Sequence, residues 1–423
     1  MKKTLIKSNN GVTLISLVVT IIVLLIISGI SIALLNGNNG ILTKATEAKS
    51  MTEKSALIEK IKTDILAQQS ADNNGNLTSI ALKQILLKYF GNVPSSDSLS
   101  SDTLLTAKNE FGSYELKISD IYNGKIVITS YYTYTDSEGQ KIPIPADFTV
   151  SSKENENKAS KGLVISDDNG NEFVWIPCSV DSTNFTKTQY NRAEWNVEDD
   201  NDTLASKNEL TLNLPDSTCS SYDIQYGLNS TITNEIVLQI NNEKNSISKY
   251  GGYYIGRYET GINQEKPIIK YNQTPYSNII WSKAYNLAKN FINTIGVDSY
   301  LCSGYSFDTA INFIQNSGTL NYATSGSFNE NWHYRFVTNG TEIIKPLNES
   351  LLLNTGLTTP QNNIYDMGGN VAEFTTEVHP GINESIIIRG GSYIDVNPAG
   401  NRLDTTVNYK SDSIGFRITL FLK

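Results

Sequence analysis

The stretch from Val12 to Leu35 is almost wholly apolar and contains no charged residue. As a helix it would be about 36 Å long, which exceeds the hydrocarbon thickness of a bilayer. It therefore predicts a membrane-spanning helix rather than a secretory signal peptide, whose apolar region is shorter and ends at a small-residue cleavage site. Lys2, Lys3 and Lys7 precede this helix. Because positive charge stays on the cytoplasmic side, we expect a single-pass cell-membrane protein whose C-terminal part is extracellular.

The short basic leader ends at Gly11, directly before the apolar run GVTLISLVV. This arrangement resembles the class III leader of type IV prepilins. The resemblance implies that a prepilin peptidase cuts between Gly11 and Val12 and that Val12 is then methylated. Pilins usually carry glutamate at the fifth mature position, which is Ser16 here. A simple membrane anchor is therefore favoured over a filament subunit, although packing against other pilin subunits stays open.

The chain after the membrane helix consists of segments with different sequence patterns. Ile41 to Gln69 has apolar residues at helical spacing, typical of a stalk helix. An amphipathic helix pattern and two strand-like runs around Asn123-Gly124 follow. The predicted segments are a leader over 1–11, a transmembrane and stalk helix over 12–70, a small pilin-like α+β module over 71–135, a linker over 136–160 and a final domain over 161–423.

Charge and cysteine content limit the possible partners. The net charge is −9 and Lys/Arg residues do not cluster, so we expect no nucleic-acid partner. Cys178, Cys219 and Cys302 are odd in number and have no metal-like spacing. At most one disulfide can form, and the sequence leaves the pairing of Cys178 with Cys219 open.

The stretch NIYDMGGNVAEF, from Asn363 to Phe374, combines a glycine pair with Asp366 and Glu373. Adjacent glycines permit a sharp turn that points carbonyl oxygens inward, where two carboxylates can join them. An all-oxygen ligand set suits calcium. The alternative is an ordinary loop with solvated acids.

Further motifs follow in order: IIIRGGSY at 386–393 and GFR at 415–417, with EFVWIP, GGYYIGRYETG and WSKAYNLAKNF earlier in the chain. Together they resemble the formylglycine-generating-enzyme-like (sulfatase-modifying factor) family over 161–423. The family's domain is a variant of the C-type-lectin fold, so the resemblance implies two helices on a small, twisted antiparallel sheet. It also implies calcium, bound by the side chains of Asp366 and Glu373 and the carbonyls of Gly369 and Val371.

In the enzymes of that family, two cysteines after RGGS bind copper and perform the oxidation. The matching positions here are Asp395 and Gly400. Neither supplies a thiolate, so we expect no copper and no such enzymatic activity.

The polar segment between RGGSY and GFR resembles the changeable region of the variable lectin-fold proteins diversified by retroelements. We predict ligand contacts there from seven residues: Tyr393, Asp395, Asn397, Arg402, Asp404, Asn408 and Tyr409. The alternative is an ordinary polar loop.

The whole sequence thus predicts an α+β protein with an N-terminal membrane-spanning, pilin-like helix, a small α+β module and a C-type-lectin-like domain. The favoured function is a non-catalytic cell-surface binding or adhesion protein with an unknown extracellular protein or glycan ligand. Two alternatives stay open. One is a minor pilin or pseudopilin of a type IV pilus or a type II secretion-like system, and the other is an unrecognised enzyme on the same fold.

Overall fold

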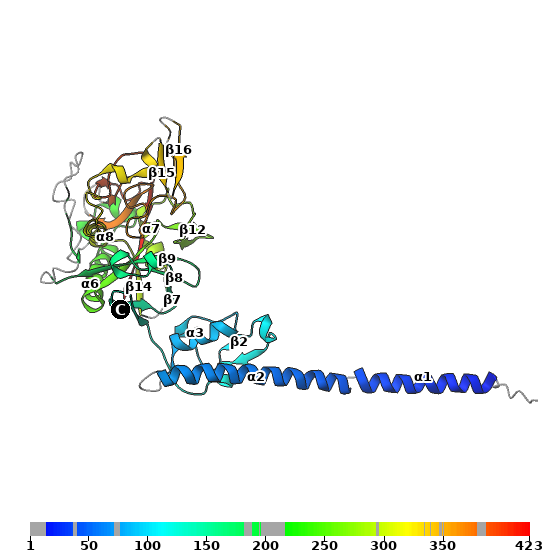
Figure 1. The fold of residues 1–423 in the computed structure, drawn as a ribbon. Helices are drawn as coiled ribbons and strands as arrows, with labels where there is room; N and C mark the ends of the chain where they lie inside the picture. Colours follow the sequence, from blue (N-terminus) through cyan, green and yellow to red (C-terminus); the bar gives the residue numbers. More distant parts are fainter. Residues whose placement is uncertain are drawn as a thin grey trace, which may run out of the picture. The chain divides into compact units, whose positions relative to one another are not determined.

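The structure is a computed structural model (Figure 1). It describes residues 14–36, 40–71, 77–181, 188–193, 195, 216–292, 296–333, 335–338, 340–346, 349, 351–378 and 386–423. Helices and strands are mixed, which confirms the coarse α+β prediction and the apolar N-terminal helix. The chain forms two compact units, Met1–Val127 and Ile128–Lys423.

In the first unit, α1 (Leu14–Asn36) carries no charged residue. Its Leu14–Ile32 stretch has a mean hydropathy of 2.9, and none of its residues is buried. The hydroxyl groups of Thr20 and Ser31 donate to backbone carbonyls one turn earlier, each at 2.7 Å. These polar groups are therefore satisfied inside the helix, as a bilayer requires. By length and composition, α1 can cross a membrane or serve as a signal sequence.

A small core forms on the second helix, α2 (Ile41–Ala71). Leu57, Ile61 and Ile65 are buried along one face and pack with α3 (Ser79–Tyr89). The remaining elements of this module are α4 (Ile118–Ile121), the 3-10 turns η1 (Ser96–Ser98) and η2 (Asn109–Phe111), the antiparallel pair β2 (Leu104–Thr106) and β3 (Glu115–Lys117), and the parallel pair β1 (Leu77–Thr78) and β4 (Ile126–Val127). The predicted hairpin around Asn123-Gly124 is wrong, because Ile126 pairs with Leu77 at the start of the module instead.

The second unit is built on a seven-stranded sheet in the order β14-β21-β11-β9-β8-β7, with β10 paired to β9. Its strands are β7 (Phe148–Val150), β8 (Val164–Asp167), β9 (Glu172–Ser179), β10 (Thr188–Gln189), β11 (Gly252–Gly256), β14 (Val297–Leu301) and β21 (Ile418–Leu422). Successive β9 residues alternate between two cores: Phe173 and Trp175 face one, and Val174 and Ile176 face the other. Both faces of this sheet are therefore covered.

Helices cover these faces. Trp281 and Ala284 of α7 (Trp281–Lys289) join one core, and Phe307 and Ile311 of α8 (Gly304–Asn316) join the other. Both helices occur where their apolar spacing predicts them. Two further helices are α5 (Ser221–Gln225) and α6 (Ser230–Tyr250), and the 3-10 turns are η3 (Glu154–Glu156), η4 (Ala159–Lys161), η6 (Asp216–Thr218), η7 (Gly326–Phe328) and η8 (Glu330–Trp332).

A four-stranded sheet carries the C-terminal motifs in the order β19-β18-β17-β20. Its strands are β17 (Ala372–Val378), β18 (Ile386–Arg389), β19 (Arg402–Thr405) and β20 (Ile414–Phe416). Three hairpins complete the unit: β5 (Tyr131–Thr135) with β6 (Lys141–Pro145), β12 (Gly261–Asn263) with β13 (Lys266–Ile268), and β15 (Arg335–Thr338) with β16 (Thr341–Ile344).

The prediction of a linker over 136–160 is wrong. This segment contains β6 and β7, and Ile142, Ile144 and Phe148 are buried in the core of the second unit. The Asp136 carboxylate accepts hydrogen bonds from backbone amides of the following turn and, at 3.0 Å, from Ala159. The polar composition hid this role, because the apolar residues are few and alternate with polar ones.

Candidate functional site

The stretch from 363 to 374 is a tight loop whose left-handed positions are not the glycines. Asp366 and Asn370 each have a φ of 61°, whereas Gly368 and Gly369 have no left-handed backbone. Gly369 is needed for a different reason, since a β-carbon there would overlap the buried side chain of Asn329. The predicted glycine turn is therefore a closely packed segment whose left-handed backbone positions are Asn363, Asp366 and Asn370.

Glu373 is held by Arg417 of the GFR motif. Arg417 Nη2 donates to Glu373 Oε1 at 2.6 Å, and Nε lies 3.0 and 3.1 Å from the two carboxylate oxygens. The other guanidinium protons go to the carbonyls of Gly256 and Tyr365, each at 2.8 Å. Both partners are completely buried. The arginine thus ties three segments of the domain together.

Two more carboxyl groups lie near this pair. Glu259 accepts from the Val371 amide at 2.8 Å and from the Asn370 carboxamide at 2.6 Å. Asp366 accepts from the Thr358 hydroxyl at 2.5 Å. Burial, together with the neighbouring carboxylates, raises the pKa of Glu259 well above its usual range and that of Asp366 to about 7. The raised pKa values favour the neutral acid at Glu259 and Asp366, so Arg417 mainly balances the charge of Glu373.

The predicted calcium ligands do not fit a metal site in this arrangement. Both oxygens of Glu373 are bound to a guanidinium, which places a fixed positive charge where the cation would need a free carboxylate. Of the remaining predicted ligands, Asp366 is bound to Thr358, and Gly369 and Val371 would offer only carbonyl oxygens. In the part of the chain that the structure describes, no group of three or more His, Cys, Asp or Glu residues is placed to hold a metal.

A second buried charge cluster lies on the strands around the RGGSY motif. Arg389 and Arg402 both bind Asp308, at 2.7 and 2.9 Å, and both bind Glu377, at 3.0 and 3.2 Å. Arg192 adds a third guanidinium and lies 2.8 Å from Asp308. Burial opposes ionisation, but the three arginine charges outweigh it and hold the pKa values of Asp308 and Glu377 below their usual range.

This cluster corrects the prediction for Arg402. Its side chain is 1% exposed and is used up by Asp308, Glu377 and the carbonyl of Ala193. It is part of the scaffold and cannot reach an external ligand without breaking buried ion pairs.

Other predicted contact residues also hold the backbone. Asp395 accepts from the amides of Ser392 and Asn397, at 3.0 and 3.1 Å, and so fixes a turn. The carboxamide oxygen of Asn408 accepts from the hydroxyls of Thr406, at 3.0 Å, and Tyr222. Asp404 is half-buried in β19, opposite Ile387. These three side chains are therefore occupied or packed, and we do not place them in a binding surface.

Three predicted residues keep accessible side chains, and three more were missed. Tyr393 and Asn397 are half-buried, and Tyr409 is 48% exposed. Ile394, Val396 and Leu403 are 49%, 48% and 54% exposed. We call these six residues the 393–409 surface. Ile394, Val396 and Leu403 could have been found in the sequence, because they are apolar residues inside an otherwise polar segment.

The positions that match the copper cysteines are also structural. Gly400 donates its amide to the carbonyl of Ala323 at 2.8 Å, and a side chain there would strike that carbonyl. Asp395 fixes the turn described above. Cys178, Cys219 and Cys302 are buried, and within the described residues no disulfide joins Cys178 to Cys219.

Comparisons with known proteins assign no family to this chain. No family model matches the chain, and no curated protein matches it. Among solved structures, Treponema denticola variable protein 1 is 13% identical over 40% of this chain and 84% of its own, with a TM-score of 0.25. PvdO from Pseudomonas aeruginosa is 14% identical over 62% and 98%, with a TM-score of 0.32. CarF is 14% identical over 41% and 87%, with a TM-score of 0.28. Likenesses of this size decide neither the fold family nor the function.

Proposed function

We propose that this protein is a membrane-anchored binding protein that displays its 128–423 unit outside the cell. The observation that carries the proposal is α1, which is uncharged and whose Leu14–Ile32 stretch has no buried residue, in one chain with a separately packed unit. Such an exposed apolar helix is stable in a bilayer and unfavourable in water. The lysines before it orient the chain with its C-terminal part outside.

The 393–409 surface is the candidate binding face. Its exposed apolar residues, Ile394, Val396 and Leu403, lie close in sequence to the half-exposed Tyr409. Leu403 belongs to β19, which is the last strand of its sheet within the described residues. Exposed apolar and aromatic residues on a soluble unit are typical of protein contacts, so we favour a protein partner over a glycan.

The test separates this surface from the scaffold beneath it. The variants Leu403→Ala, Val396→Ala and Tyr409→Ala are presented on cells and probed with a library of displayed peptides and with a glycan array. We expect loss of peptide capture without a change in melting temperature, with Lys410→Ala as the exposed control. Unchanged capture by all three variants, or capture of glycans alone, contradicts a protein-binding role for this surface.

A filament subunit is the second candidate, favoured by the first half of α2. Ile41, Leu42 and Met51 are 70%, 59% and 71% exposed, although the helix is amphipathic further along. Helices of neighbouring subunits would cover such residues. Recovery of the protein in sheared filament fractions, and its loss there in an Ile41→Asp variant, would favour this function over a simple anchor.

A further inference from the structure

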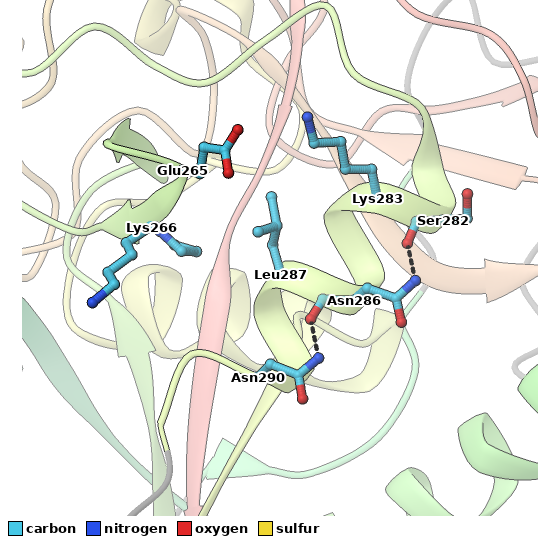
Figure 2. A pocket seen from close by; sticks show the side chains of 8 residues that line it. Glu265, Lys266, Ser282, Lys283, Asn286, Leu287 and Asn290 are labelled. Atoms are coloured by element: carbon cyan, nitrogen blue, oxygen red, sulfur yellow. Dashed lines mark hydrogen bonds between the residues drawn. The ribbon is translucent and has the colours of Figure 1, made fainter.

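A cavity of about 550 Å³ opens between α7 and the β12–β13 hairpin. Figure 2 shows the side chains that line it. None of them belongs to the 393–409 surface or to either buried charge cluster. Its lining residues are Glu265, Lys266, Pro267, Ser282, Lys283, Asn286, Leu287 and Asn290. Its volume lies within the range of small-molecule sites, about 300–1,000 Å³.

Three charged residues line this cavity: Glu265 and Lys266 from the hairpin and Lys283 from α7. Figure 2 shows the ammonium group of Lys266 turned away from the other two, so Glu265 and Lys283 form the opposite-charge pair at the site. Glu265 lies in the hairpin turn, where its φ of 64° and that of Gln264, 47°, are both left-handed. Lys283 lies in the first turn of α7, with its ammonium nitrogen 5.3 Å from the centre of the Tyr276 ring. Figure 2 shows the carboxylate and the ammonium group above Leu287. Both side chains are exposed, and Lys283 contacts the Tyr276 side chain as well as lying within electrostatic reach of Glu265.

Two apolar residues and two amide side chains of the cavity lining are held in place by packing or hydrogen bonds. Leu287 and Pro267 are half-buried and supply apolar contact. Asn286 donates its carboxamide to the carbonyl of Ser282, and Asn290 donates to that of Asn286, each at 2.8 Å. These bonds fix both amide groups along the helix and leave their oxygens as acceptors. The site therefore needs little reorganisation to bind a ligand.

The charges select the chemistry of the occupant. A simple anion would pair with Lys283 but leave Glu265 without a cationic partner, and a simple cation would do the reverse. A neutral sugar would pair with neither charge, and no aromatic side chain lines the cavity for its ring to stack on. A ligand with a cationic end, an anionic end and an apolar part matches all three features.

We propose that this cavity binds a zwitterion of the α-amino-acid class, either a free amino acid or a short peptide with free ends. Its ammonium group pairs with Glu265, its carboxylate pairs with Lys283, and its apolar part lies on Leu287 and Pro267. This site is independent of the 393–409 surface, so each can fail without the other.

The test uses the full chain in detergent micelles and titration calorimetry with leucine and trileucine. Leucinamide and N-acetyl-leucine each lack one charge, and N-acetyl-leucinamide lacks both. We expect binding of leucine or trileucine and at least about tenfold weaker binding of every blocked derivative, because each loses a charge-assisted hydrogen bond. Preference for trileucine identifies a peptide, and preference for leucine identifies a free amino acid.

Variants locate the site. Glu265→Gln and Lys283→Gln should each weaken binding about tenfold or more, while Lys410→Gln leaves it unchanged. The double exchange Glu265→Lys with Lys283→Glu should restore binding even where the single variants lose it. No binding of either zwitterion at 10 mM, equal binding of the blocked derivatives, or full binding by both single variants would overturn the proposal.

Discussion

Arg402 and Tyr409 show how differently two neighbouring polar residues of one segment are used. Arg402 lies in β19, where its guanidinium binds Asp308 and Glu377 in the core. Tyr409 follows this strand and is 48% exposed. Between them, Val407 is fully buried and fixes the chain. A change at the first residue alters the folded core, and a change at the second alters only the surface.

This contrast predicts different stabilities. Arg402→Ala leaves two buried carboxylates with fewer partners, so we expect a loss of about 3–5 kcal/mol in the free energy of unfolding. Tyr409→Ala should change it by less than about 0.5 kcal/mol. Denaturant unfolding of the two variants and of Lys410→Ala measures both values. An Arg402→Ala protein as stable as the parent would mean that the ion pairs contribute nothing.

Asp366 predicts a pH dependence with a definite sign. Burial raises the pKa of its carboxyl to about 7, so the folded state binds a proton that the unfolded state releases near pH 4. The stability linked to this proton is complete below about pH 4 and is lost as the pH rises through 7.

The matched variant is Asp366→Asn, which keeps an acceptor for Thr358 and cannot ionise. As the pH rises from 5 to 8, the parent loses stability and the variant does not. We expect the free energy of unfolding of the variant, relative to the parent, to rise by about 1–3 kcal/mol over this range, which is a shift of several degrees in melting temperature. Equal melting curves at both pH values would show that Asp366 is ionised without cost.

At the scale of elements, the stretch from 363 to 374 is linked to Arg417, which lies between two strands. Glu373 in β17 and Arg417 between β20 and β21 are fully buried partners. Asn370 also joins this loop to the Leu353 backbone, at 2.9 and 3.1 Å. An internal guanidinium thus links these segments, and calcium at this loop stays a prediction.

Chelation tests this substitution of arginine for metal. With Arg417 on Glu373, we expect EDTA and 1 mM calcium to leave the melting temperature unchanged. Arg417→Met should lower the melting temperature strongly in either solution, because Glu373 then stays buried without a partner. A calcium-dependent rise in the parent protein would establish the calcium site and require Arg417 to move.

The strands within 136–160 are a second case in which whole elements matter. Ile142 and Phe148 contribute to the core of the second unit, and Tyr254 donates its hydroxyl to the Pro143 carbonyl at 3.0 Å. A fragment that begins at Ile128 keeps these contacts, and one that begins at Lys161 exposes the core beneath them.

We therefore expect the 128–423 fragment to melt cooperatively. The 161–423 fragment should melt at least about 10 °C lower or aggregate, since losing several buried apolar side chains costs many kcal/mol. Circular dichroism of both fragments provides the comparison. Identical melting temperatures of the two fragments would show that 136–160 is a linker.

For the whole molecule, we expect the N-terminal segment to determine where the protein resides. The predicted cleavage site, Gly11 and Val12, lies outside the described residues, and α1 begins just after it. We expect the mature chain to start at Val12 and to stay in the membrane fraction. Deletion of residues 14–36 should release the protein into the soluble fraction.

Intact mass of the membrane-bound protein measures the processing, and fractionation measures the anchoring. A chain that still begins at Met1 would rule out the prepilin leader and leave an ordinary signal anchor. A 14–36 deletion that stays in the membrane would place the anchor elsewhere.

The sequence by itself determined the features that depend on local pattern. An uninterrupted apolar run predicts α1, spacing at one helical face predicts α7 and α8, and the strand-like motifs occur as β18 and β20. In each case the signal lies within one element, because side-chain periodicity follows backbone geometry.

Only the tertiary structure decided which polar residues face inward. Arg402 meets Asp308 and Glu377, and Glu373 meets Arg417, across many intervening residues. A charged side chain in a polar segment has the same local pattern whether it is solvated or buried. The difference arises from the distant partner that compensates its desolvation, and that partner is set by how the strands pack.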